Sequence, residues 1–212
     1  MDVTVLNVFS NMKLDSFTWW NHIKIKEEEY EKLRLLESEI AIEKVLNYKF
    51  ISVRETSTRI TNKTNEEIFK DISEVLEKIF KENHFDIIMI PMGIGEHPDH
   101  LCVFDYFIER YAYGKLRAEI ILYPEYPYAR CKKSYIDRLN KINNKFKLEE
   151  SIVDIEDKLK NMINAISVYK SQFDDIDKNQ MLAIVREDGR AVATEYNKEH
   201  ISLVYYKIIS EE

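Results

Sequence analysis

The chain alternates short apolar runs with segments of helical periodicity, and this alternation constrains the fold more than any other feature of the sequence. Val3–Phe9 is a continuous apolar, β-branched run of the kind expected for a buried parallel strand, and Phe85–Met92 is the strongest predicted strand. Thr64, followed three residues later by Glu67, is the signature of a helix N-terminus. Shorter strands are expected at Phe50–Val53, Glu119–Tyr123 and Ile201–Ile208. The order of elements predicts an α/β fold with a mainly parallel sheet, in a single domain over residues 1–212.

The last third of the chain is predicted to be mostly helical. Residues 159–169 place apolar side chains on one face of a helix. Between Met181 and Tyr196 the apolar residues recur at helical spacing, which favours a helix over a hairpin at Asp188 and Gly189.

Composition and charge exclude some classes of partner. The formal net charge is −7, so no basic surface is available to attract a nucleic-acid backbone. No apolar stretch approaches the roughly 20 residues that a membrane helix needs. Cys102 and Cys131 are too few for a disulfide framework and are expected to be small buried side chains. We therefore expect a cytoplasmic protein with no nucleic-acid partner and no membrane partner.

A dense group of acid–base and metal-ligating side chains follows the strongest strand. The segment Gly93–His100 begins at the carboxyl end of that strand, where open α/β sheets bind ligands. If its proline lies in the first turn of a helix, His100 is placed to hold a metal and His97, just outside the helix, faces a substrate. Asp99 can orient an imidazole. The motif alone leaves a second interpretation open, in which Asp99 caps the helix and both histidines only pack.

The sequence resembles the PIG-L/LmbE family of zinc-dependent N-deacetylases at several separate positions. His97–His100 matches the His-Pro-Asp-His that follows a strand in this family. Further matches lie in other parts of the chain, at Arg34, Glu37, Ala41, Tyr169, Ser171, Gln172, Glu195 and Tyr196. The resemblance covers nearly the whole chain and implies a Rossmann-like parallel sheet flanked by helices.

The resemblance also implies a reaction and individual roles. The reaction is hydrolysis of an acetamide on an amino sugar, or of a related small amide, by a zinc-bound water. By position, His100 would be a zinc ligand, and His97 would stabilise the tetrahedral intermediate with Asp99 tuning that histidine. The substrate would be contacted by Arg34, Glu55 and Arg59, although Glu55 and Arg59 match the family pattern imperfectly and Arg34 can also be a solvated charge. Aromatic residues at Trp19, Trp20 and Tyr123–Arg130 are expected to flank the pocket mouth, where they stack on sugars or pack the loops.

One part of the family pattern is not found in these 212 residues. The first strand of the family ends in His-Pro-Asp-Asp-Glu, which supplies two more zinc ligands and the catalytic base, whereas Met1 falls where the second strand begins. A catalytic zinc usually takes three protein ligands, and Asp15 and His22 are candidates at the correct sheet edge. His84 precedes its strand and is expected about 20 Å from the loop. His200 is expected to be a surface or packing histidine.

Three hypotheses follow from this departure. The chain is an N-terminally incomplete copy of a deacetylase, or a catalytically silent relative that binds a sugar or an active subunit, or a chain completed by residues from another polypeptide. The expected partners are a small amide or amino-sugar substrate and a second chain, either a copy of this one or a complementing chain. Loss of a central strand exposes backbone groups and apolar neighbours, so we also expect marginal stability or self-association.

Overall fold

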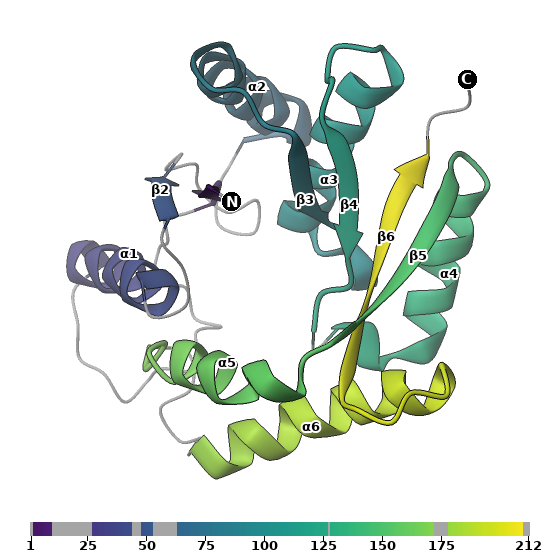
Figure 1. The fold of residues 1–212 in the computed structure, drawn as a ribbon. Helices are drawn as coiled ribbons and strands as arrows, with labels where there is room; N and C mark the ends of the chain where they lie inside the picture. Colours follow the sequence, from purple (N-terminus) through teal and green to yellow (C-terminus); the bar gives the residue numbers. More distant parts are fainter. Residues whose placement is uncertain are drawn as a thin grey trace.

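The structure is a computed structural model that describes residues 2–9, 27–43, 48–52, 63–126, 128–171 and 178–209. Strands and helices alternate along most of the described chain and build the predicted α/β fold (Figure 1). The strands are β1 Val3–Asn7, β2 Tyr48–Ser52, β3 Ile87–Pro91, β4 Glu119–Tyr123, β5 Lys147–Asp154 and β6 Ser202–Ile209. The α-helices are α1 Glu27–Glu43, α2 Asn65–Glu82, α3 Pro98–Ala112, α4 Lys132–Asn143, α5 Leu159–Ile166 and α6 Lys178–Glu195. Short 3-10 turns lie at η1 Ile94–Glu96, η2 Tyr128–Arg130 and η3 Glu156–Lys158.

The described strands fall into two hydrogen-bonded sheets. β1 and β2 form a parallel pair, and the second sheet has the order β3-β4-β6-β5. β3 and β4 are parallel, whereas β6 runs antiparallel to both β4 and β5. The predicted α/β class is confirmed, with parallel strands around β3 and an antiparallel extension. β5 was not among the expected strands, because its eight residues include four charged side chains and so lack the apolar run of a buried strand.

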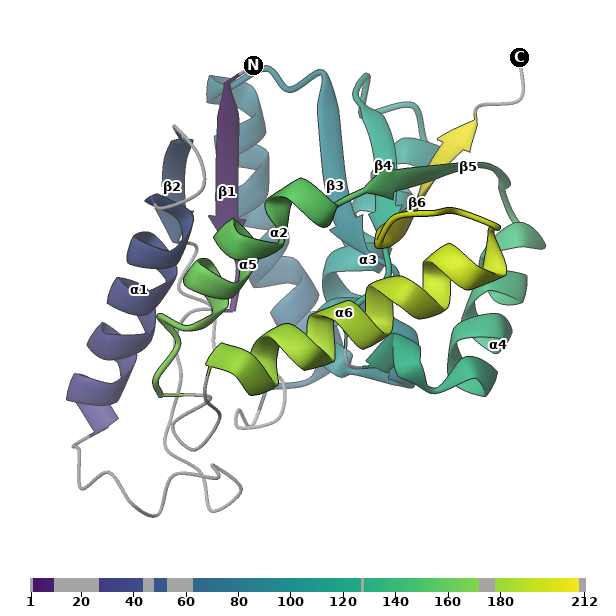
Figure 2. The same cartoon turned by 60° about the horizontal axis from the view of Figure 1, so that its bottom comes forward.

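Helices lie on both sides of the larger sheet, although Ile87 and Met89 on one face of β3 stay exposed. Figure 2 shows α2 and α3 on one side of β3 and β4, with α5 and α6 on the other. The capping box predicted at Thr64 is present, because its hydroxyl accepts from the Glu67 amide and the Glu67 carboxylate accepts from the Thr64 amide. The helix that it opens contributes fully buried Ile68, Ile72 and Leu76 to the main core. Among the described helices, none combines the length and the apolar content of a membrane span.

Packing against β6 explains why a helix, and not a hairpin, contains Gly189. Gly189 is buried in α6, and a Cβ atom built on it would lie 2.2 Å from Cγ2 of Ile201, just before β6. The glycine therefore allows a close approach of helix and strand, and it does not mark a turn.

Candidate functional site

Two glycines shape the loop that leaves β3. Gly93 and Gly95 have φ of 78° and 73°, in the left-handed region that side chains disfavour. A Cβ at Gly93 would lie 2.7 Å from Leu101 Cδ2, and one at Gly95 would lie 3.1 Å from Tyr128 Cδ1. The loop is therefore tight, and it brings His97 and α3 to the carboxyl edge of β3, as predicted.

His97 is the N-cap of α3. Its Nδ1 accepts a hydrogen bond of 3.2 Å from the Asp99 amide, and Pro98 opens the first turn. Because Nδ1 is an acceptor, the neutral ring carries its proton on Nε2. The N-terminal cap of α3 is therefore the side chain of His97 and not that of Asp99, which is buried in the first turn of the helix.

His100 lies against His97 at this edge. The two rings stack with centroids 4.7 Å apart and an angle of 27° between their planes. The Tyr128 ring meets both edge-on, at 5.9 Å from His97 and 5.6 Å from His100. The His100 side chain is 31% exposed while its Nδ1 is buried, so the ring reaches solvent by its other edge and is not sealed in the core.

A buried carboxylate, Glu125, joins the histidines to the loop. It follows β4 and accepts hydrogen bonds from the amides of Gly93 at 2.7 Å and Ile94 at 3.5 Å. Its Oε1 lies 3.1 Å from His100 Nδ1, a close polar contact that lacks the alignment of a hydrogen bond. Tyr123–Arg130 was expected to flank the site, but this role of Glu125 was not predicted. An acidic residue two positions after a strand, at the same sheet edge, was the available signal.

Arg138 of α4 supports the same loop from behind. Its Nε donates to the Met92 carbonyl at 2.6 Å, and its guanidinium lies over the Phe104 ring, 4.3 Å from the centroid. Burial lowers the pKa of Arg138, and the nearby carboxylates, Glu125 among them, oppose that shift. The cation therefore places a positive charge near Glu125.

A second group of residues that match the family pattern forms a separate cluster between α1 and the chain after α5. Arg34 donates from Nη1 to Ser171 Oγ at 3.3 Å and to Glu37 Oε2 at 3.4 Å, and lies over the Tyr169 ring. Ser171 also donates its amide to Glu37 Oε1 at 2.7 Å, and its hydroxyl binds Oε2. The structure thus brings these matched residues together. The contacts of Arg34 with described residues reach Glu37, Tyr169 and Ser171 but neither His97 nor His100.

Several predicted residues fall outside the described part of the chain. These are Glu55, Arg59, Asp15, His22, Trp19, Trp20 and Gln172. His84 is exposed and lies 3.4 Å from Asp86 before β3, at the opposite end of the strand from the loop, as expected. Tyr196 donates to Glu150 of β5 at 2.6 Å, so it joins α6 to the sheet.

The described residues do not by themselves form a zinc site. Within those ranges, no group of three or more His, Cys, Asp or Glu side chains is arranged to hold a metal ion. His100 is one candidate ligand with a carboxylate behind it, whereas a catalytic zinc usually needs three protein ligands.

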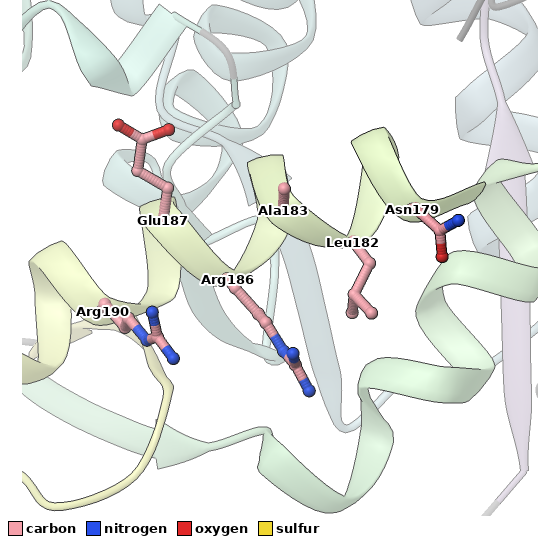
Figure 3. Close-up of a pocket in the computed structure, with 6 residues that line it drawn as sticks. All are labelled: Asn179, Leu182, Ala183, Arg186, Glu187 and Arg190. Carbon is pink, nitrogen blue, oxygen red and sulfur yellow. The ribbon is translucent and has the colours of Figure 1, made fainter. Parts of the chain in front are cut away.

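A hollow of about 410 Å³ lies on α6. Its lining residues include neither His97 nor His100. Figure 3 shows that Arg186 and Arg190 point to the same side of the helix, away from Glu187. The hollow is lined by Asn179, Leu182, Ala183, Arg186, Glu187 and Arg190. Because all six belong to one helix and include no histidine, the hollow is not the candidate hydrolytic site.

Together these features define a class: an α/β protein with a histidine pair, backed by a carboxylate, at the carboxyl edge of its sheet. No family model matches the chain, and no curated protein is similar to it in sequence. Solved structures do match. The deacetylase Dbv21, which acts on A40926 pseudoaglycone, aligns with a TM-score of 0.74 and 19% identity, over 100% of this chain and 87% of its own. The N,N'-diacetylchitobiose deacetylase of Pyrococcus horikoshii aligns with a TM-score of 0.63 and 18% identity, over 98% and 73%.

These two deacetylases belong to the PIG-L/LmbE family, so the resemblance seen in the sequence is confirmed at the level of the fold. The fold also occurs with other chemistry. GalB, the 4-carboxy-2-hydroxymuconate hydratase of Pseudomonas putida, aligns over 100% of this chain and 97% of its own, with a TM-score of 0.59 and 10% identity. Function therefore has to be argued from the site.

Proposed function

We propose that this chain is a hydrolase of the N-deacetylase type, which removes an acetyl group from an amino sugar or a related small amide in the cytoplasm. The observation that carries the proposal is the stacked pair His97 and His100 at the carboxyl edge of β3, with Glu125 behind it. Two of the solved structures with this fold are an A40926 pseudoaglycone deacetylase and an N,N'-diacetylchitobiose deacetylase. Cys102 and Cys131 are not joined in a disulfide, in keeping with a reducing compartment, but Cys102 is half-buried and Cys131 is exposed, whereas both were expected to be buried.

The geometry supports a different role for each histidine. The cap on Nδ1 of His97 keeps the proton on Nε2, and this N–H donates to the oxygen that becomes negative as the amide carbonyl is attacked. Asp99 is buried in the same turn, and its own backbone N–H is the donor to Nδ1 that sets this tautomer. His100 presents the edge opposite Nδ1 as one ligand of a divalent metal, zinc being the first candidate, with the other ligands lying outside the described residues.

The substrate side of the proposal rests on Arg34, Glu55 and Arg59, which we assign to the hydroxyl groups of the sugar. Arg34 has a buried Nε that lacks a hydrogen-bond partner among the described residues, so its guanidinium retains donor capacity beyond Ser171 and Glu37. Its position against Tyr169 also places an aromatic ring next to the cation.

A second candidate function follows from the described residues, among which no three side chains are arranged to hold a metal ion. A site without a complete set of metal ligands can bind an N-acetylated sugar without cleaving it. The two candidates differ in one product: the hydrolase releases acetate and the binding protein does not.

Acetate release from a panel of N-acetylated amino sugars, measured with and without added zinc, tests the proposal. We expect release by the purified chain, a loss on the order of a hundredfold or more in His97→Ala, and no change in His84→Ala. His84 is the matched control because it is an exposed histidine before the same strand. Sugar binding without acetate release would favour the second candidate. Equal acetate release by the His97→Ala variant and the parent chain would refute the role of His97.

A further inference from the structure

The hollow on α6 is flanked by two arginines that share one side of the helix. Arg186 and Arg190 are both exposed and lie four residues apart, which makes them neighbours on the helix surface. Figure 3 shows their guanidinium groups on the same side of α6. Like charges at this spacing repel each other. An anion bound between the two guanidinium groups removes this repulsion.

Neither arginine is neutralised by a described carboxylate. Three other arginines, Arg34, Arg110 and Arg130, pair with Glu or Asp at 3.4, 2.6 and 2.6 Å. Within the described ranges, the side chains of Arg186 and Arg190 make no ion pair and no hydrogen bond. Carboxylates are not scarce, because the sequence has 38 Asp and Glu against 31 Lys and Arg. The described part of the chain therefore leaves both cations available to an anion from outside it.

The carboxylates in the same turns of α6 face another way. Glu187 lines the hollow but points away from Arg186 and Arg190 in Figure 3. Asp188 pairs with Arg130 of η2 at 2.6 Å. The pKa of Arg130 is raised, first by its hydrogen bond to Asp188 and to a smaller extent by the nearby charge of Glu187. The acidic side of this part of α6 thus faces η2, and the basic side faces the hollow.

The remaining walls of the hollow carry no charge. Leu182 is half-buried and packs against an apolar cluster around Leu159, so this wall is held in place. The short side chain of Ala183 leaves space beside it, and Asn179 lies at the end away from Arg190. The volume of about 410 Å³ lies within the range of about 300–1,000 Å³ that is typical of small-molecule sites. One end of the hollow is therefore cationic, and the rest suits a small uncharged body.

We propose that the α6 hollow binds a phosphate monoester of a small molecule. The phosphate lies between Arg186 and Arg190, and the carbon body lies along Leu182 and Ala183. A phosphate monoester carries a charge of about −1.5 to −2 at neutral pH, which matches two guanidinium groups better than the single charge of a carboxylate does. Arginine also suits this anion because its planar fork donates two parallel hydrogen bonds to phosphate oxygens.

The length of the hollow and the charge of the protein restrict the ligand further. Asn179 and Arg186 are seven residues apart, about 10 Å along the helix axis, which leaves room for a body of about one ring. A nucleic acid fits less well, because two cations on a chain of net charge −7 do not attract a long polyanion. The lining residues include neither His97 nor His100, so the inference does not depend on the proposed hydrolase activity.

Isothermal titration calorimetry of the full chain with phenyl phosphate tests this inference. Phenyl sulfate is the matched control, because it has nearly the same shape and one negative charge, and inorganic phosphate keeps the charge but lacks the ring. We expect phenyl phosphate to bind about tenfold more tightly than either control at the same ionic strength. None of the three ligands contains an amide, so failure here leaves the proposed deacetylase function untouched.

Substitutions in the hollow locate the binding site. Arg186→Gln and Arg190→Gln are each expected to weaken phenyl phosphate binding about tenfold, because each removes one charged donor. Arg117→Gln is the matched control, since Arg117 is also exposed and makes no ion pair with a described residue. Ala183→Leu fills the space for the ring, so it is expected to weaken phenyl phosphate binding and to leave inorganic phosphate binding unchanged.

Circular dichroism of each variant checks that the fold is kept, as expected for substitutions at exposed positions. The absence of phenyl phosphate binding, equally tight binding of phenyl sulfate, or equal weakening by Arg117→Gln would each overturn the inference. Unchanged binding in both Arg186→Gln and Arg190→Gln would also overturn it, by placing the ligand elsewhere on the protein.

Discussion

Replacing Glu125 tests whether this buried carboxylate organises the site. In Glu125→Ala the buried amide of Gly93 loses its 2.7 Å acceptor, and the amide of Ile94 loses a longer contact of 3.5 Å. A hydrogen bond to a charged group contributes about 1.5–3 kcal/mol, and a bond of 3.5 Å contributes little. We therefore expect the free energy of unfolding to fall by about 2–3 kcal/mol. Glu125→Gln keeps an oxygen acceptor for Gly93, so a loss of about 1 kcal/mol is expected.

The assay is urea denaturation, with the free energy of unfolding taken by linear extrapolation. The matched control is Glu96→Gln in the same loop, where the carboxylate is exposed and pairs with Lys141 at 2.9 Å. This control is expected to unfold like the parent chain. Nitrogen NMR of His100 adds a local readout, because Glu125→Ala removes the carboxylate oxygen that lies 3.1 Å from its Nδ1. If Glu125→Ala unfolds at the same urea concentration as Glu96→Gln, the carboxylate does not hold the loop and the reasoning is refuted.

Two further predictions concern packing and helix capping. Gly189→Ala is expected to lower the free energy of unfolding by about 1–3 kcal/mol, because the new Cβ meets Ile201 at 2.2 Å, although alanine usually favours a helix. A urea midpoint at or above that of the exposed control Thr194→Ala would contradict this packing argument. Thr64→Ala is expected to cost about 1 kcal/mol by removing the capping box with Glu67, seen as a melting temperature lower by about 2–4 °C in circular dichroism. An unchanged melting temperature would show that this cap adds nothing to global stability.

The positions of most elements could be predicted from local patterns. The apolar run before the glycine loop, the capping box at Thr64 and the helical spacing from Met181 to Tyr196 all correspond to described elements. The strand β5 could not be predicted in this way, because its charged side chains face solvent at the outer edge of the sheet and its place depends on pairing with β6. Edge strands owe their stability to a partner far along the chain more than to their own apolar content.

The features of the candidate site also differ in whether local sequence patterns could predict them. The glycine loop, the cap by His97 and the closeness of His97 to His100 all lie within eight residues and follow from local preferences. A φ above zero favours glycine, and proline favours the first helical turn. The approach of Glu125 to His100, the support of the loop by Arg138 and the contact of Arg34 with Ser171 were decided by the tertiary structure. These contacts join residues that are 25, 46 and 137 positions apart and belong to different parts of the fold. Local spacing in the sequence carries no information about which of these parts meet. The division of the described strands into two hydrogen-bonded sheets is of the same kind, because the pairing of a strand depends on its neighbours as well as on its own residues.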